Sequence, residues 1–408
     1  MENIKHIPTV GVICELNPLH NGHVYLLSQA RALVGDEGCV VCVMSGRSTQ
    51  RGEIAIADPY LRGKTAILGG ADLVVELPFP WSSGSAEVFA KAGVHILSQM
   101  GVEHLIFGSE CGNLSLLSLV ADLVGSAEFG NIYGDFCNQG MGTAVAYQKA
   151  IATLAQKQGA SLPQGFPASN DLLGVAYLVA NRNVGMTPHT VKRLGQGYNE
   201  SILRDVDFPS ATSLRLLMSE ASEDVLSLSA MLDGCMPDAC KATLLEGVEG
   251  DVLPVQGQKL LPLCHAYFRL LTDFDNGTAE LSGGLDRHLH KVALQATSAD
   301  EFWDMAQTKQ YTEARLKRGM LFALTGVKSC DLATTPDYAT LLAANAMGCR
   351  FMSAFKKSAG LPIVTKPADA PLSRQRDLCE QIDALYTLCM PKPKSSGYLT
   401  RMSPYIQK

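Results

Sequence analysis

Between residues 8 and 110, short apolar runs alternate with longer stretches in which apolar residues recur at helical spacing. Such runs predict buried strands, and the stretches between them predict helices. Strands are predicted at residues 9–14, 40–44, 73–77 and 104–107, and helices at residues 22–33, 59–68 and 85–100. Because single helices separate the strands, we predict an α/β fold with a Rossmann-like, doubly wound parallel sheet.

The pattern changes after about residue 220, where β-branched runs become rare and helical spacing dominates. Helices are predicted at residues 224–231, 240–245, 264–271, 312–324, 338–346 and 378–388. We therefore predict two domains: residues 1–220 form the doubly wound sheet, and residues 221–408 form a mostly α-helical C-terminal domain.

Composition agrees with an ordinary globular protein, since 47% of the 408 residues are hydrophobic and 18% are charged. The net charge of −6 is unevenly divided, because residues 301–408 carry +6 and residues 1–300 carry −12. A basic region of this kind favours contact with a polyanion such as nucleic acid. Two differently solvated surfaces are the alternative explanation.

Neither the N-terminus nor any apolar run has the features of a targeting or membrane-spanning segment, so we expect a cytoplasmic protein without membrane contact. The single C-x-x-C pair, Cys39 and Cys42, lies in a predicted strand. We interpret it as part of the core rather than as a redox or zinc site, and we predict no metal ligands in the chain.

The loop after the first predicted strand contains an H-x-G-H pattern, at the edge where ligands bind to such sheets. His20 and His23 would share one face at the N-terminus of a helix, where free N–H groups and the helix dipole favour an anion. Gly22 would let a phosphate or a base approach the backbone. This arrangement suits nucleotidyl transfer, in which imidazoles stabilise the charge that builds on the α-phosphate of ATP. The alternative is two surface histidines beside a turn.

A second candidate phosphate-binding element lies at residues 210–215, where hydroxyl side chains and an arginine begin an apolar helical run. Thr212 and Arg215 could bind the β- and γ-phosphates, with Arg215 giving charge-assisted hydrogen bonds. The alternative is an ordinary helix that begins at a Ser or Thr N-cap.

Together these elements resemble the nucleotidyltransferase superfamily, and more closely the chain resembles the tRNA(Met) cytidine acetate ligase family. The resemblance covers nearly the whole sequence. The matching stretches are ELNPLHNGH at residues 15–23, MSG at 44–46, QRGE at 50–53, GADLVVELP at 70–78, FGSE at 107–110, SND at 169–171, KRL at 192–194, ARLKR at 314–318 and LPIVTK at 361–366.

The resemblance implies an enzyme that activates acetate with ATP to acetyl-adenylate and transfers the acetyl group to the wobble cytidine of elongator tRNA(Met), forming N4-acetylcytidine. It implies that residues 1–220 are the ATP-binding catalytic domain, with His20 and His23 as catalytic residues, and that Mg²⁺ accompanies ATP. The expected ATP contacts, which include the two residues of the second element, are Ile13, Cys14, Glu15, Leu16, Asn17, Pro18, Leu19, Asn21, Gly22, Val24, Tyr25, Leu26, Gly108, Asn170, Arg193, Leu194, Thr212 and Arg215.

A polar loop follows the second predicted strand and forms a candidate substrate loop. Its residues are Ser45, Gly46, Gln50 and Arg51. Arg51 could pair with the carboxylate of acetate or with a phosphate, and a structural ion pair is the alternative.

Two acidic residues lie at the third predicted strand, Asp72 just before it and Glu76 within it, and their even spacing directs them to the same face. An acid/base pair is one interpretation. We favour a network of ion pairs near Arg62 or Lys64.

The basic C-terminal third would supply the contacts with tRNA phosphates, although each cation could equally belong to a solvated face. The candidates are Arg315, Lys317, Arg318, Lys356 and Lys357, with Lys328, Arg350 and Lys366 as further cations. Two rival functions stay open: an adenylyltransferase acting on a small phosphorylated metabolite, and a non-catalytic nucleotide- or RNA-binding protein. The intact pair of His20 and His23 argues against the second rival.

Overall fold

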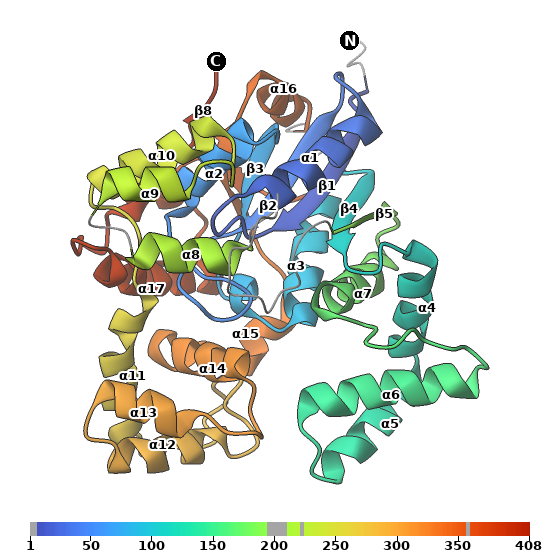
Figure 1. Cartoon of the computed structure of the whole chain (residues 1–408), viewed down its shortest axis with the longest axis vertical. Coiled ribbons are helices and arrows are strands. Elements are labelled where there is room, and N and C mark those ends of the chain that lie inside the picture. Colours follow the sequence, from blue (N-terminus) through green and yellow to red (C-terminus); the bar gives the residue numbers. More distant parts are fainter. Residues whose placement is uncertain (1–5, 194–209, 221–223, 356–359) are drawn as a thin grey trace.

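The structure, a computed structural model, describes residues 6–193, 210–220, 224–355 and 360–408. Its centre is an eight-stranded sheet in the order β5-β4-β1-β2-β3-β6-β7, with β8 also beside β6 (Figure 1). The predicted doubly wound parallel sheet is confirmed, with one exception that was not predicted: among the described strands, the β3–β6 pair is antiparallel. The strands are β1 (Thr9–Cys14), β2 (Cys39–Ser45), β3 (Leu73–Leu77), β4 (His104–Ser109), β5 (Thr187–Lys192), β6 (Ala339–Ala344), β7 (Ile363–Val364) and β8 (Tyr405–Ile406).

Helices cover both faces of the sheet, which explains why the central strands are mostly apolar. Helices α1 (Asn21–Val34) and α2 (Pro59–Leu68) pack on one face together with alternate residues of β2, such as Val40 and Cys42. The other face, which includes Val41 and Val43, packs against α3 (Ala86–Gln99), α7 (Ser169–Asn181) and α16 (Ala346–Phe355). The alternation of β2 between two cores fixes its register.

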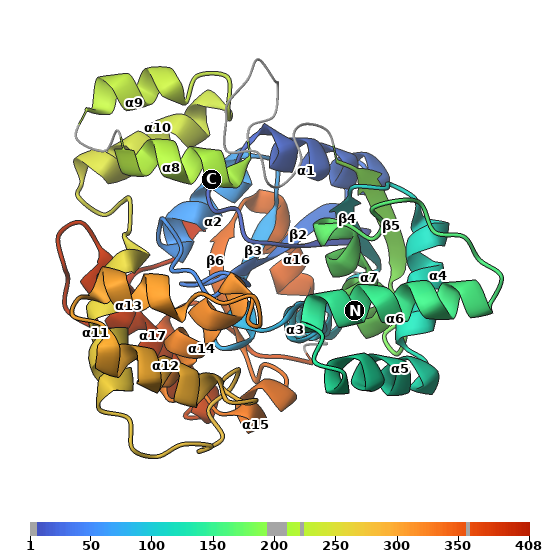
Figure 2. The ribbon, with the colours of Figure 1, turned by 60° about the horizontal axis from the view of Figure 1, so that its bottom comes forward.

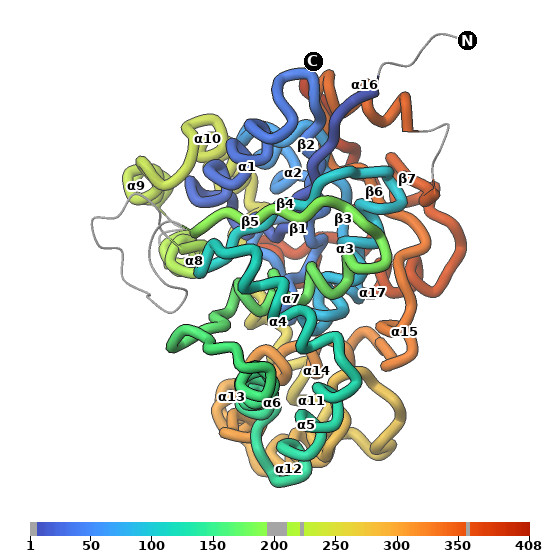
Figure 3. The backbone as a smooth tube through the Cα atoms, turned by 90° about the vertical axis from the view of Figure 1, so that its right-hand side faces the viewer, coloured from blue at the N-terminus to red at the C-terminus, as the bar shows by residue number. Residues whose placement is uncertain are grey.

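The other helices lie mainly outside these two layers (Figure 2). Figures 1 and 3 show that the pair α5–α6 and the group α11–α14 project from the same end of the molecule. The helices outside the two layers are α4 (Leu114–Val124), α5 (Ala127–Asn138), α6 (Thr143–Lys157), α8 (Ala211–Glu220), α9 (Val225–Met231), α10 (Asp238–Glu249), α11 (Leu261–Arg269), α12 (Leu285–Gln295), α13 (Ala299–Ala306), α14 (Glu313–Thr325), α15 (Ser329–Ala333) and α17 (Arg374–Cys389), with short 3-10 turns at Trp81–Ser83, Gly257–Leu260, Pro367–Asp369 and Leu399–Arg401.

None of the helices in the described ranges is long and apolar enough to cross a membrane.

The helix predicted at residues 338–346 is wrong, because this segment forms β6. Every residue of β6 is buried, and its backbone pairs with β3 in the register Leu73↔Ala344 and Val74↔Ala343. Its Ala- and Leu-rich sequence favours a helix locally, but the open edge of β3 supplies partners that local sequence does not reveal. The sheet therefore includes strands from both sides of the expected boundary at residue 220, and the division into two domains stays a prediction.

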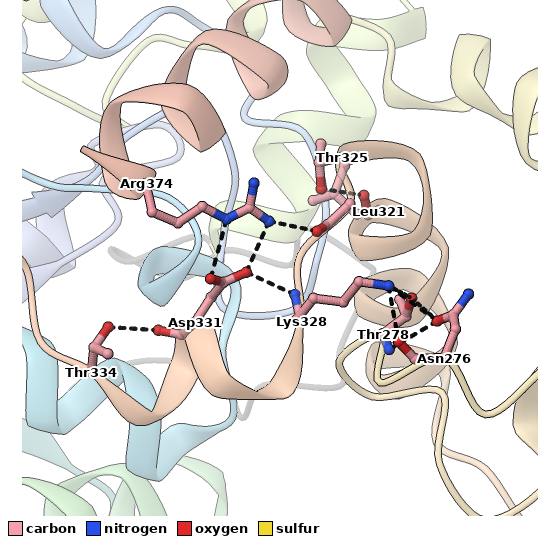
Figure 4. Close-up of polar contacts among 9 residues, drawn as sticks. Asn276, Thr278, Leu321, Thr325, Lys328, Asp331, Thr334 and Arg374 are labelled. Carbon is pink, nitrogen blue, oxygen red and sulfur yellow. Dashed lines mark hydrogen bonds and ion pairs between the residues drawn. The ribbon is translucent and has the colours of Figure 1, made fainter. Parts of the chain in front are cut away.

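Polar contacts fasten the C-terminal helices to one another (Figure 4). The guanidinium of Arg374 at the start of α17 donates to both carboxylate oxygens of Asp331 in α15, at 3.2 and 3.1 Å. Lys328, one of the predicted tRNA contacts, donates from Nζ to the carbonyl oxygen of Asn276 (3.0 Å) and to the hydroxyl of Thr278 (3.3 Å). In this structure Lys328 therefore holds the loop before α12 in place.

Candidate active site

The two histidines of the H-x-G-H pattern begin α1 at the carboxyl edge of β1. His20 is the N-cap, and its Nδ1 accepts the backbone N–H of Gly22 at 3.0 Å. The Nδ1 of His23 accepts the backbone N–H of His20 at 3.3 Å. An imidazole nitrogen that accepts a hydrogen bond carries no proton, so both neutral rings have their proton on Nε2. Each histidine therefore keeps one N–H donor available for a ligand.

Both imidazoles are neutral near pH 7. Burial, and after it the positive charge of Arg193, lowers the pKa of His20 to about 3. Burial together with His20 and Arg193 holds the pKa of His23 well below its ordinary value. The two rings, with centroids 3.9 Å apart, could not both be protonated without strong repulsion.

Gly22 has a structural role that the sequence did not reveal. A Cβ at this position would lie 2.8 Å from Cε1 of His20. Glycine is therefore required because the His20 ring folds back over the first turn of α1, whereas approach of a ligand to the backbone stays a prediction.

The ends of β4 and β5 bring further predicted residues to the histidines. The side chain of Arg193, which follows β5, lies over Gly108, where a Cβ would be 3.3 Å from its Cγ. The charge of Arg193 acts on both imidazoles. Glu110, just after β4, accepts from the side chain of Asn170 at 2.6 Å and so fixes this residue at the start of α7.

The second phosphate-binding element also lies beside the first loop. Ser210 caps α8 through the N–H of Ser213 at 3.1 Å. From α8, Arg215 donates to the carbonyl oxygen of Asn17 at 2.9 Å and to the hydroxyl of Thr212 at 3.2 Å. The structure thus brings residues 198 positions apart to one edge of the sheet. Leu194, predicted to contact ATP, lies outside the described residues.

The remaining predicted ATP contacts lie in or near the first loop, and their side chains differ in solvent exposure. Leu16 and Leu19 are buried in the core between the sheet and α1, and Leu16 has a left-handed backbone with φ of 47°. Asn21 is engaged by the loop before α10, since its side chain donates to the carbonyl oxygen of Gly234 at 2.6 Å. Ile13, Cys14, Asn17 and Pro18 are buried, whereas Glu15, Val24, Tyr25 and Leu26 are half-buried.

The substrate loop is tied directly to the first loop. A carboxylate oxygen of Glu15 accepts the backbone N–H of Gln50 at 2.7 Å, and the Gln50 side chain donates to the carbonyl oxygen of Gly84 at 3.2 Å. Burial raises the pKa of Glu15 in spite of this hydrogen bond and the charge of Arg215. Ser45 is buried, and Arg51 is half-buried and near Glu53.

Asp72, just before β3, and Glu76 of β3 take part in structural ion pairs, as expected, but with partners other than Arg62 and Lys64. Asp72 pairs with Arg31, and Glu76 pairs with Arg47, which also donates to Asp383 of α17 at 3.1 Å. A Cβ on Gly46 would collide with the Glu76 carboxylate.

Two buried groups, Asp383 and Arg62, were not predicted from the sequence to have the roles that the structure shows. Burial is the main reason why the pKa of Asp383 is raised to about 6. Arg62 contacts three carbonyl oxygens, those of Glu15, Gly46 and Ala57, instead of pairing with Asp72 or Glu76. The position of Arg62 among apolar residues of α2 was the feature of the sequence that could have indicated a buried arginine with several backbone partners.

The predicted tRNA cations of α14 are engaged by carboxylates. Lys317 contacts Glu53 at 2.6 Å and Glu313 at 2.7 Å. Arg318 is buried and pairs with Glu280 at 3.0 Å, and Arg315 approaches the same carboxylate at 3.7 Å. Their contact with tRNA stays a prediction, and Lys356 and Lys357 lie outside the described residues.

A histidine pair at the first helix of a doubly wound sheet, with arginines from two other elements beside it, defines a nucleotidyltransferase of the H-x-G-H class. The HIGH Nucleotidyl Transferase family model matches residues 7–400.

Curated relatives narrow this assignment. A protein from Acetivibrio thermocellus named tRNA(Met) cytidine acetate ligase is 33% identical over 407 residues, which cover 94% of this chain and 95% of the relative. A protein of the same name from Anoxybacillus flavithermus is 31% identical, with coverage of 96% and 97%. The chain belongs to the tRNA(Met) cytidine acetate ligase family, and the resemblance seen in the sequence is confirmed.

Solved structures agree with this result. The crystal structure of Thermotoga maritima TmcAL bound with alpha-thio ATP superposes with a TM-score of 0.85 at 27% identity, covering 98% of this chain and 100% of the other. The apo form of the same protein gives a TM-score of 0.89 with the same coverage.

Proposed function

We propose that this chain activates acetate with ATP and transfers the acetyl group to the wobble cytidine of elongator tRNA(Met), forming N4-acetylcytidine. A carboxylate oxygen of acetate attacks the α-phosphorus of ATP, and pyrophosphate leaves. The exocyclic amine of the cytidine then attacks the carbonyl carbon of acetyl-adenylate, and AMP leaves. The names of the relatives and the ATP analogue in the T. maritima structure support this reaction.

The observation that carries the proposal is the pair of Nε2–H donors on His20 and His23 at the N-terminus of α1. Neutral imidazoles donate to the α-phosphate without repelling each other, and the helix N-terminus adds to their attraction for negative charge. In this proposal Arg193 and Arg215 bind the outer phosphates, and Gly108 and Asn170 contact the nucleoside.

We place acetate next to the substrate loop. Gln50 is fixed against Glu15, so the loop that follows β2 adjoins the loop that carries the histidines. Arg51 is the cation of this loop that would neutralise the acetate carboxylate before attack.

Magnesium is expected to arrive with ATP. In the described part of the chain, no three His, Cys, Asp or Glu side chains converge in a way that could hold a metal ion. A magnesium ion that arrives with ATP would be held mainly by phosphate oxygens and water, with at most one or two carboxylates of the protein, and we assign no step to it.

We place tRNA over the end of the molecule where α14 lies, with residues 1–220 as the catalytic domain and residues 221–408 as the domain that holds tRNA. Support comes from the net charge of +6 in residues 301–408 and from the packing of α14 on the substrate loop, where a Cβ on Gly52 would lie 2.5 Å from the backbone nitrogen of Arg318. An acceptor of this kind implies a cytoplasmic activity.

The test is incubation of the protein with ATP, labelled acetate and tRNA(Met), followed by digestion and mass spectrometry of the nucleosides. We expect N4-acetylcytidine, and none from a control tRNA whose wobble cytidine is replaced by uridine. If no label from acetate enters the tRNA and a phosphorylated metabolite is adenylated, the rival adenylyltransferase would be favoured instead.

A further inference from the structure

One carboxylate, that of Glu53, is shared by cations from two helices that are far apart in the sequence. Its Oε1 lies 2.6 Å from Nζ of Lys317 in α14. Its Oε2 lies 3.6 Å from a guanidinium nitrogen of Arg215 in α8. Glu53 ends the QRGE stretch of the substrate loop, so this loop joins the two helices at the edge of the candidate site.

The three side chains are reachable by solvent without being free in it. The exposed fractions are 28% for Glu53, 27% for Lys317 and 23% for Arg215. Partial burial alone would raise the pKa of Glu53, but the charges of Lys317, Arg215 and Arg51 outweigh it and lower the pKa. Glu53 is therefore a carboxylate at neutral pH, and its negative charge lets Lys317, Arg215 and Arg51, which repel one another, lie near it.

Arg215 and Lys317 each have a second partner in the chain, and the two partners lie in different elements. Arg215 donates to the carbonyl oxygen of Asn17 in the H-x-G-H loop, on the ATP side. Lys317 contacts Glu313 on the exposed side of α14. The inference rests on the proposed function, in which Arg215 binds phosphates of ATP and Lys317 binds a phosphate of tRNA.

We propose that Glu53 is a positioning residue that makes the binding of the ATP triphosphate and the binding of tRNA mutually unfavourable. When a triphosphate draws Arg215 away, the repulsion between Arg215 and Lys317 beside Glu53 is relieved. Glu53 then holds Lys317 more tightly, and moving Lys317 to a tRNA phosphate becomes more costly. When pyrophosphate leaves, Arg215 returns to Glu53 and the hold on Lys317 weakens. Acetyl-adenylate formation and tRNA engagement are thereby ordered in time, and linkage requires the effect to be equal in both directions.

The experiment measures the Kd of labelled tRNA(Met) at one fixed salt concentration, with and without saturating ATP, and with acetate omitted so that no adenylate forms. ATP should weaken tRNA binding to the wild-type protein by about 5-fold. In Glu53→Gln, tRNA binding without ATP should be tighter and the effect of ATP should fall to less than about 2-fold.

Glu313→Gln is the matched control, because Glu313 contacts the same Lys317 but does not contact Arg215. This variant should keep the full effect of ATP on the Kd of tRNA. The inference is overturned if wild-type binding is unaffected or strengthened by ATP, if Glu53→Gln keeps the wild-type effect, or if Glu313→Gln loses it as well. A wild-type protein that binds ATP but no tRNA would instead overturn the proposed function, and the inference with it.

Discussion

At the scale of single residues, the chemistry of His20 and His23 depends on which ring nitrogen is already in use. Both Nδ1 atoms accept backbone N–H groups, so in the proposed reaction the Nε2–H groups would be the donors to phosphate. Asparagine can replace Nδ1 as an acceptor, whereas glutamine extends a donor to about the position of Nε2. The two isosteres therefore separate the structural role of each ring from its chemical role.

His23→Asn should keep the hydrogen bond from the backbone of His20 and lower the rate of acetyl-adenylate formation by about 10²–10³-fold. His23→Gln should retain more of the rate, because its amide can still donate toward the phosphate. Pyrophosphate-exchange kinetics give the rates, and circular dichroism checks the fold. Equal rates in His23→Asn and wild type would refute the role of Nε2–H.

The depressed pKa of His20 makes a prediction about stability. In the folded protein this imidazole stays neutral down to about pH 3, whereas in the unfolded chain it binds a proton below about pH 6.5. The unfolded state binds more protons in this window, so the contribution is fully present above it and is lost as the pH falls, at up to about 1.4 kcal/mol per pH unit. Urea unfolding between about pH 7 and pH 5 should show a steeper loss in wild type than in His20→Asn, an efficient N-cap without a titrating ring. Parallel curves would contradict the buried, neutral state of His20.

At the scale of elements, local sequence was sufficient where an element forms its own pattern. The predicted boundaries of β1, α2 and β3 agree with the structure at both ends, because apolar runs and the Asp58-Pro59 helix start are local signals. It failed at β6, whose alanines and leucines are buried only because β3 lies beside them. The H-x-G-H loop was predictable because its residues form a local sequence pattern. The ion pair of Glu53 with Lys317 was not, since 264 positions separate the two residues.

The contact between the substrate loop and α14 depends on Gly52. Its φ is 78°, and a Cβ there would lie 2.5 Å from the backbone nitrogen of Arg318. Gly277 has the same φ but nothing within 4 Å, so it is a matched control for backbone strain alone. Gly277→Ala should cost about 1 kcal/mol, and Gly52→Ala should cost about 2–3 kcal/mol because it also separates the loop from the helix. Urea unfolding compares the two, and equal losses would show that the contact contributes nothing beyond strain.

At the scale of the whole molecule, the sheet joins the two halves of the chain. β6 comes from the C-terminal half and covers the edge of β3, where its residues are buried. The spacing of apolar residues predicts a boundary at residue 220, because the pairing of β3 with a strand more than 260 residues later does not affect the local pattern. The same long-range closure brings α8, α14 and α17 to the carboxyl edge of the sheet, where the candidate site is built.

A chain that ends at residue 337 should therefore not fold as an independent unit. Its β3 would present an unpaired, apolar edge, which favours aggregation. Size-exclusion chromatography and thermal unfolding should show aggregates and no cooperative transition. A monomeric, cooperatively unfolding fragment would indicate that residues 1–337 complete their core without β6.

The central claim is that this fold uses its histidine pair to join acetate to the α-phosphate of ATP. The most direct measurement is the exchange of labelled pyrophosphate into ATP, in the absence of tRNA and with or without acetate. We predict exchange that requires acetate and that His23→Asn reduces by about 10²–10³-fold. Exchange that ignores acetate, or that needs a phosphorylated metabolite in its place, would contradict the account.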